Sequence, residues 1–333
     1  MTDVELIEFR LMVQPQYHGW RLDRYIAARI PRLSRSRIQQ MIRAQRELGG
    51  LSLRPASRVR AGQELRFLRP APEEPDVPRH VSVVFRDQSL LAIDKPSGLP
   101  VHATARFHKN TLTAVLRETF PEGPLPIMAH RLDRETSGLL LLGLGRASGV
   151  ALKRSFRERR VQKRYLAIVH GAAPDEGVID LSLGPDLVSG IRVKMAVRED
   201  GQPSLTRFRT LERRGSYSLL EASPETGRQH QIRAHLCAIG HPVLGDKLYG
   251  QPPEVWLEFI ETGWTASLEA RLLIPRHALH ASGARLPHPL SGEPLELSCA
   301  LADDLRAFWE GLAGNGDAGP QEPSRRAPTA SAT

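Results

Sequence analysis

The sequence has little cysteine, and this excludes one class of protein. Its 333 residues include two cysteines, Cys237 and Cys299, and neither has a partner at Cys-x-x-Cys spacing. Two cysteines cannot build the disulfide framework of a small secreted domain, and they do not form a thiolate zinc site. A reducing compartment, the cytoplasm, is therefore expected.

Long apolar runs and phosphate-binding loops are also absent. No stretch of 18 apolar residues occurs, so no membrane-spanning helix is predicted and no membrane partner is expected. The first ten residues carry three acids and lack the apolar core of a signal peptide. No Gly-x-x-x-x-Gly-Lys-Ser/Thr loop is present, so nothing in the sequence indicates a nucleotide cofactor.

Positive charge is concentrated at one end of the chain. The net charge is +9, and residues 1–70 hold 14 arginines and no lysine against 6 acidic residues, a net charge of +8. The rest of the chain is close to neutral, at +1. Such an asymmetry predicts a polyanion-binding module attached to a nearly neutral body.

Two amphipathic helices are expected in the basic region. The first ends at Pro31, and the second begins after Ser34, a residue type that caps helix N-termini well. Ile38 and Ile42 recur at helical spacing and predict the buried face of the second helix. The candidate contacts to an anionic ligand are its outward-facing arginines Arg35, Arg37 and Arg43.

The composition divides the chain into four parts. Residues 1–69 form the basic domain, and residues 70–80, with four prolines, form a semi-stiff linker. Residues 81–313 form the second domain, and residues 314–333, rich in Gly, Pro, Ser, Ala and Thr, predict a disordered tail. Within the second domain, short strands joined by tight turns outnumber helices. This pattern is typical of an α+β fold with a mixed, mostly antiparallel sheet.

A polar stretch followed by a leucine run is the first candidate site. Asp133 lies between Arg131 and Arg134, so its carboxylate is expected to stay ionised at neutral pH. The run Leu139–Leu142, followed by glycine, predicts a strand buried on both faces, which would give Asp133 a rigid support. The alternative is a solvated loop with ordinary surface charges.

A second charged cluster lies about 100 residues downstream. It contains Arg228, His230, Arg233 and His235 after a glycine turn. Metal binding is the competing interpretation of the two histidines. They are five residues apart, however, rather than the three or four that place two ligands on one helical face, and no carboxylate lies between them. No metal is therefore expected.

Together these stretches resemble the RluA-type family of RNA pseudouridine synthases. The similar segments are His130-Arg131-Leu132-Asp133 with Thr136-Ser137-Gly138, and Gly227–Arg233, in which Gln229 stands where the family usually has threonine. Further similar segments follow in the family's order at residues 94–98, 163–165, 240–249, 276–281 and 288–289. The resemblance covers about residues 81–309. Residues 21–67 resemble the S4 RNA-binding domain, which often precedes this catalytic domain.

The resemblance implies an enzyme that converts uridine in RNA to its C5-linked isomer without cofactor or metal. It implies that Asp133 acts at C1′ of the target nucleotide, as nucleophile or base, and that Arg228 pairs with it. Tyr165 would stack on the target base and assist removal of the C5 proton. Arg131 would fill the gap left when that nucleotide is flipped out of the RNA. His230 and Arg233 are expected to contact RNA.

Two other function classes remain as alternatives. One is a non-catalytic RNA-binding or ribosome-assembly factor with the same fold. The other is a nucleoside-cleaving glycosidase, which would need a second carboxylate as proton donor, and no comparable motif supplies one. The separate basic module favours a large structured substrate, with large-subunit ribosomal RNA ahead of transfer RNA. A monomer is expected.

Overall fold

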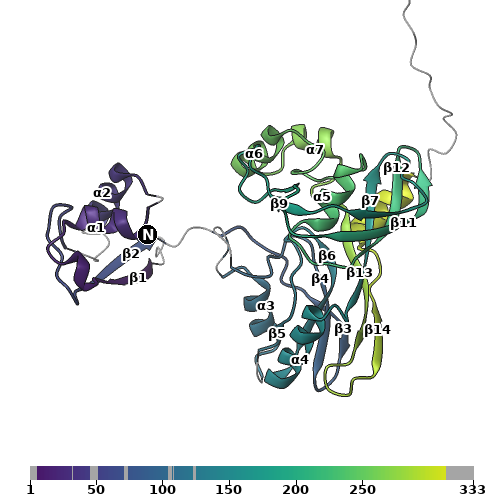
Figure 1. The fold of residues 1–333 in the computed structure, drawn as a ribbon, viewed down its shortest axis with the longest axis horizontal. Coiled ribbons are helices and arrows are strands. Elements are labelled where there is room, and N and C mark those ends of the chain that lie inside the picture. The colour runs from purple at the N-terminus through teal and green to yellow at the C-terminus, as the bar shows by residue number, and fades with distance from the viewer. Residues whose placement is uncertain are drawn as a thin grey trace, which may run out of the picture. The chain divides into compact units, whose positions relative to one another are not determined.

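The computed structural model describes residues 6–31, 33–45, 52–70, 74–103, 107, 109–122 and 125–312. The chain divides into two compact units, Met1–Glu74 and Pro75–Thr333 (Figure 1). The predicted disordered tail, residues 314–333, lies outside the described residues, as do residues 71–73 of the predicted linker.

The first unit combines two helices with a two-stranded sheet. Its elements are β1 (Leu6–Met12), a 3₁₀ helix η1 (Pro15–Tyr17), α1 (Leu22–Arg29), α2 (Arg35–Ala44) and β2 (Glu64–Pro70). The side chain of Ser34 accepts a hydrogen bond from the Arg37 backbone N–H at 3.3 Å, as expected of an N-cap residue. Ile38 and Ile42 are fully buried, which confirms the predicted inner face of α2.

The second unit is built on a ten-stranded sheet. Its central path runs in the order β3-β4-β6-β13-β7-β12-β11-β8, with β5 on β6 and β14 on β13. The strands are β3 (Ser82–Arg86), β4 (Leu90–Lys95), β5 (Ile127–Met128), β6 (Ser137–Gly143), β7 (Gln162–His170), β8 (Glu176–Asp180), β11 (Leu205–Arg214), β12 (Tyr217–Pro224), β13 (Leu279–Pro287) and β14 (Pro294–Ser298). A separate two-stranded sheet pairs β9 (Leu183–Pro185) with β10 (Met195–Val197).

Every pairing in the large sheet is antiparallel except that of β6 with β13. The sheet is therefore mixed and mostly antiparallel, as the sequence predicted. Six helices accompany it in the described part of this unit: α3 (Leu112–Thr119), α4 (Gly145–Arg157), α5 (Gln231–Ala238), α6 (Pro253–Thr262), α7 (Ala266–Leu272) and α8 (Asp303–Gly311). Figure 1 shows α3 and α4 beside the part of the sheet that contains β3, β4 and β6, and α5, α6 and α7 grouped near β9.

Strand β6 is buried along its whole length, which confirms the predicted strand buried on both faces. At its start, Gly138 has a φ of +104°, and a Cβ added there would lie 2.3 Å from the backbone oxygen of Ala281 on β13. No side chain fits at that distance, so glycine allows β6 and β13 to meet. This contact joins the two halves of the sheet immediately after the loop that carries Asp133.

None of the described helices combines the length and the apolar character that crossing a bilayer requires.

Candidate active site

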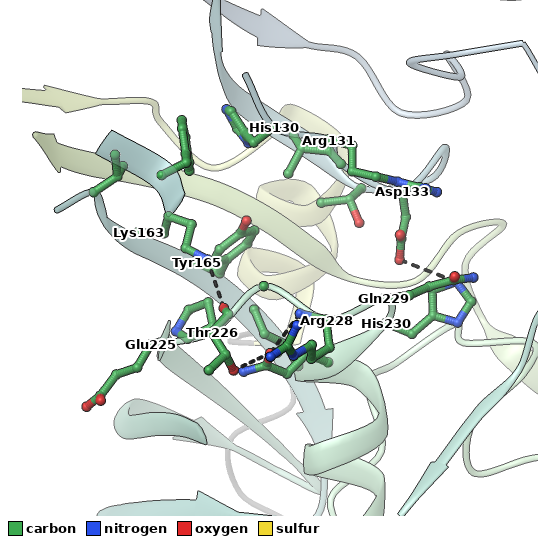
Figure 2. Close-up of a pocket in the computed structure, with 18 of the residues that line it drawn as sticks. His130, Arg131, Asp133, Lys163, Tyr165, Glu225, Thr226, Arg228, Gln229 and His230 are labelled. Atoms are coloured by element: carbon green, nitrogen blue, oxygen red, sulfur yellow. Dashed lines mark hydrogen bonds and ion pairs between the residues drawn. The ribbon is translucent and has the colours of Figure 1, made fainter. Parts of the chain in front are cut away.

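The two charged stretches of the sequence line one cavity of about 690 Å³. One wall consists of residues 129–133, which lead into β6, and a second wall of residues 224–233, which run from the last residue of β12 into α5. Tyr165 on β7 and the C-terminal end of α4 complete the lining. Figure 2 shows Asp133 and His230 on one side of this cavity and Lys163 on the other. The strand order β6-β13-β7-β12 thus brings residues 129–133 and residues 224–233, which are about 100 residues apart in the sequence, to the same cavity.

Asp133 is paired with Arg233, and not with Arg228 as the resemblance implied. Nη1 of Arg233 donates a hydrogen bond to Oδ2 of Asp133 at 2.9 Å. The Nε of Arg228 instead faces the carbonyl oxygen of Pro203 at 3.4 Å, and Arg228 has no ion pair within the described residues. The predicted Arg228–Asp133 pair is therefore wrong. The reason is local: His230 adopts a left-handed conformation, with φ 55°, and α5 begins only after it.

Arg233 is held from its other side by Asp246, a residue that the sequence analysis did not identify. Nε and Nη2 of Arg233 donate to the two Asp246 oxygens at 2.6 and 2.8 Å. Asp246 is buried, and its Oδ1 also accepts the backbone N–H groups of Leu248 and Tyr249. The Arg233 side chain is only 6% exposed, so it serves the two carboxylates rather than an RNA phosphate. The only available signal for Asp246 was its place in the segment 240–249.

The environment keeps Asp133 ionised at neutral pH. Burial opposes the charge, but the basic neighbours His230 and Arg233 outweigh it and lower the pKa of Asp133. Burial also lowers the pKa of His230 to about 4, with Arg233 adding to the effect. His230 is therefore neutral near pH 7, and Arg233 supplies the charge that stabilises the carboxylate there. The Asp133 side chain remains 20% exposed, so a ligand in the cavity can reach it.

His230 is fixed by a neighbouring tyrosine. Its Nδ1 lies 3.1 Å from the hydroxyl of Tyr249, which also accepts the backbone N–H of Met195 at 2.9 Å. The Tyr249 ring lies below the Arg233 guanidinium, 5.1 Å from ring centroid to Cζ. The imidazole Nε2 remains 3.9 Å from Oδ2 of Asp133. These contacts place a neutral imidazole beside the carboxylate.

Tyr165 lies on β7 between the neighbouring strands β12 and β13. Its cross-strand neighbours are two residues with small side chains, Ala222 and Ala281. Burial, and then the nearby charge of Asp133, raise the pKa of its phenol. Tyr165 is therefore a neutral hydroxyl and an apolar ring in the same cavity as Asp133.

The loop that carries Asp133 is clamped by distant residues. The fully buried Lys95 donates to the carbonyl oxygens of Pro96, Leu99 and Arg134, at 2.7 to 3.1 Å. Further contacts to the loop are Lys247 to the Glu135 carboxylate, His277 to the Thr136 hydroxyl, and His280 and Arg276 to the Ser137 hydroxyl. A carboxylate on so constrained a loop has a defined position, which excludes the alternative of an ordinary solvated loop.

Two further basic groups face the same cavity. Nζ of Lys163 donates to the carbonyl oxygen of Thr226 at 2.9 Å, and burial lowers the pKa of Lys163 to about 8 (Figure 2). The Nε2 of His130 accepts the backbone N–H of Leu141 at 2.9 Å, and its ring stacks on Phe156. Burial lowers the pKa of His130 to about 3. His130 is thus a neutral structural group that ties the loop to β6.

The other candidates fall into two groups. Arg131 is exposed at the edge of the cavity, whereas Arg35, Arg37 and Arg43 are exposed on α2 of the first unit. His235 is buried and bonded to Thr206 and to the Leu181 carbonyl oxygen. Across the described ranges, no three His, Cys, Asp or Glu side chains gather as metal ligands would.

Comparisons with known proteins are consistent with this geometry. The family model described as RNA pseudouridylate synthase matches residues 89–238, which span both walls of the cavity. A ribosomal large subunit pseudouridine synthase D of Nitrosomonas europaea is 34% identical over 91% of this chain and 87% of its own length. One of the same name from Xanthomonas campestris is 35% identical over 88% of this chain and 89% of its own.

A solved structure shows the same architecture. Human RNA Pseudouridylate Synthase Domain Containing 4 is 28% identical and superposes with a TM-score of 0.56, over 70% of this chain and 93% of that one.

Proposed function

The chain belongs to the RNA pseudouridylate synthase family and is an RNA pseudouridine synthase; we propose that it modifies uridines of large-subunit ribosomal RNA and that Asp133 performs the chemistry. The curated relatives are named for the large ribosomal subunit. The observation that carries the role of Asp133 is its ion pair with Arg233, inside a cavity lined by both motifs.

The reaction is an isomerisation and balances without a cofactor. The N1–C1′ bond breaks, the freed uracil turns, and a C5–C1′ bond forms. The proton leaves C5, and N1 ends with a proton. The carboxylate of Asp133 acts at C1′ while the glycosidic bond is broken, as nucleophile or as base. Arg233 is buried and is also bonded to Asp246, so its guanidinium has a fixed position. It therefore orients the carboxylate of Asp133.

The target base must leave the RNA stack to reach Asp133. A cavity bounded by Tyr165, Ile232 and Leu279 offers the base an apolar surface, and the neutral phenol of Tyr165 can stack on it. Arg131 would fill the gap that the flipped nucleotide leaves, and its exposed position in the lining of the cavity supports this role. The first unit, with three exposed arginines on α2, would serve as an S4-like docking module for the same RNA.

The test is modification of an unmodified large-subunit ribosomal RNA transcript. Pseudouridine is detected by carbodiimide-dependent primer extension, and free uracil is measured in the same reaction. Wild-type protein should form pseudouridine without releasing uracil, whereas Asp133→Asn should bind the RNA but form none. Uracil release would indicate a glycosidase. Binding without either product would indicate a non-catalytic factor, and pseudouridine formed by folded Asp133→Asn would remove Asp133 from the mechanism.

A further inference from the structure

The edge of the cavity contains a group of cations that neither motif includes. Lys153 and Arg157 lie four residues apart on α4, and Arg159 follows just beyond its end. All three line the cavity that contains Asp133, and all three are exposed. We call these three residues the α4 edge.

The three side chains are not engaged in polar contacts within the described part of the protein. None of them has an ion pair or a side-chain hydrogen bond within the described residues. Their neighbours Arg154 and Arg160, in contrast, are both paired with Glu158. Of the carboxylates that line the cavity, Asp133 is paired with Arg233, and Glu225 with Arg207. Glu158 lies near enough to interact with the charge of Arg157, but no carboxylate is ion-paired with the α4 edge, which therefore presents net positive charge to the cavity.

Arg159 occupies a position where helices commonly have glycine. The backbone N–H of Arg160 bonds to the Ser155 oxygen at 2.9 Å, and that of Arg159 to the Phe156 oxygen at 3.1 Å. These two bonds form a Schellman motif, whose left-handed residue is usually glycine. Arg159 has a φ of 56°.

Backbone strain in the described residues is concentrated at this cavity. The non-glycine residues with positive φ are Arg159, His230 and Leu273, and the first two line the cavity. Strained conformations of this kind persist only where the surrounding structure holds them, and they cluster at functional sites. An arginine retained where glycine would be more stable indicates that its side chain has a role other than ending the helix.

We infer that Lys153, Arg157 and Arg159 bind the phosphodiester backbone of the RNA strand next to the flipped nucleotide. This inference rests on the proposed function and gives the catalytic unit a phosphate site of its own, independent of the arginines of α2. A strand whose target base enters the cavity must pass its opening, and the α4 edge lies on that opening. Guanidinium and ammonium groups bind phosphate oxygens through charge-assisted hydrogen bonds.

A purely structural role predicts a different result. Basic residues near a helix C-terminus also interact favourably with the helix dipole. If that were their only purpose, removing them would lower stability and leave RNA affinity unchanged. Arg159→Gly separates the two roles, since glycine relieves the left-handed strain and removes the cation in one change.

The experiment measures binding of the full chain to an unmodified large-subunit ribosomal RNA transcript at several KCl concentrations, together with the melting temperature. Each lost phosphate contact should flatten the slope of log K against log salt by about 0.7–0.9 and weaken binding about fivefold near 0.15 M salt. Arg159→Gly should show this loss with an unchanged or raised melting temperature, and Arg159→Lys should retain the wild-type slope. The triple change of Lys153, Arg157 and Arg159 to Ala should flatten the slope by about 2–3.

The matched control is Arg146→Ala, which removes an exposed arginine of the same helix that does not line the cavity. It should leave affinity and slope unchanged. The inference is overturned if Arg159→Gly binds with the wild-type slope, if Arg146→Ala loses as much affinity, or if the loss in Arg159→Gly accompanies a lowered melting temperature. The binding measurement does not depend on pseudouridine formation. A wild-type protein that formed no pseudouridine would refute the proposed function, but the comparison of RNA binding between the variants would still test the phosphate site.

Discussion

Arg233 contacts Asp133 with one nitrogen of its guanidinium and Asp246 with the other two. The plane of the guanidinium is fixed by Asp246, which is itself fixed by two backbone N–H groups. The orientation of the exposed carboxylate at Asp133 is therefore determined by a fully buried carboxylate on another loop. This arrangement predicts different effects of substituting Arg233, Arg228 and Asp246, and each effect can be measured.

Replacing Arg233 with lysine should reduce the rate at saturating RNA by about 100-fold or more, because an ammonium cannot bind both carboxylates in one plane. Arg228→Lys is the matched change and should leave the rate close to wild type, since Arg228 does not contact Asp133. Single-turnover pseudouridine formation measures both. Equal losses in the two variants would show that the pairing seen here does not govern catalysis.

Asp246→Asn should lower the rate at saturating RNA by roughly 10- to 100-fold with little change in RNA affinity. The guanidinium of Arg233 would no longer be held in place by a carboxylate. A suitable control is Asp87→Asn. Asp87 also accepts two backbone N–H groups and one side-chain nitrogen, that of His288, but it does not line the cavity. Asp87→Asn should affect the melting temperature alone. A positioning role for Asp246 would be untenable if the two variants lost the same stability and neither lost rate.

Tyr165→Phe keeps the ring and removes the hydroxyl. RNA affinity should persist, because stacking depends on the ring, while isomerisation should slow if the hydroxyl assists loss of the C5 proton. Filter binding and single-turnover rates separate the two effects. A variant that turns over at the wild-type rate would limit Tyr165 to stacking.

The rate at saturating RNA should be independent of pH between about pH 5 and 7. Burial opposes ionisation of Asp133, but His230 and Arg233 lower its pKa, so the carboxylate is lost only as the pH falls through that lowered value. His230, with a pKa of about 4, becomes charged in the same acidic range. The pH profile of the single-turnover rate checks this. An acid limb centred near pH 6 would contradict the assigned ionisation state.

Gly138→Ala should destabilise the protein by about 3–5 kcal/mol, because its Cβ would overlap the Ala281 backbone in a left-handed conformation. Gly145→Ala is the control. That glycine also has a positive φ, of 79°, but an added Cβ would meet no atom within 4 Å, so a cost of about 1 kcal/mol is expected. Urea unfolding measures both. Similar losses would show that the close β6–β13 contact is not required.

Much of the site could be predicted because its parts are continuous in sequence. The leucine run predicted strand β6, and Asp133 precedes that strand by only a few residues. The pairing of Asp133 could not be predicted in the same way. It depends on the left-handed turn at His230, which directs the third residue after it, Arg233, rather than Arg228, toward Asp133. A histidine gives no sign in the sequence that it adopts a conformation usual for glycine.

Long-range contacts account for the other omissions. Asp246 acts through Arg233, and its importance appears only when α5 and the loop after it are placed together. Strand β1 was not predicted, because it pairs with β2 more than 50 residues away, and Glu8 and Arg10 obscured the alternation of Phe9 and Leu11. The α4 edge was missed because its three residues lie along and just after an ordinary helix and become significant only where they line the cavity.

The clamp on the Asp133 loop also has a consequence for the order of events during protein synthesis. Asp133 leaves the ribosome early, but Lys247, Arg276, His277 and His280, which hold residues 135–137, are made more than 100 residues later. A nascent chain that ends before β13 contains Asp133 but lacks His280 and the strand that pairs with β6. Catalytic activity should therefore appear late and abruptly during translation, when the last strand next to β6 is inserted.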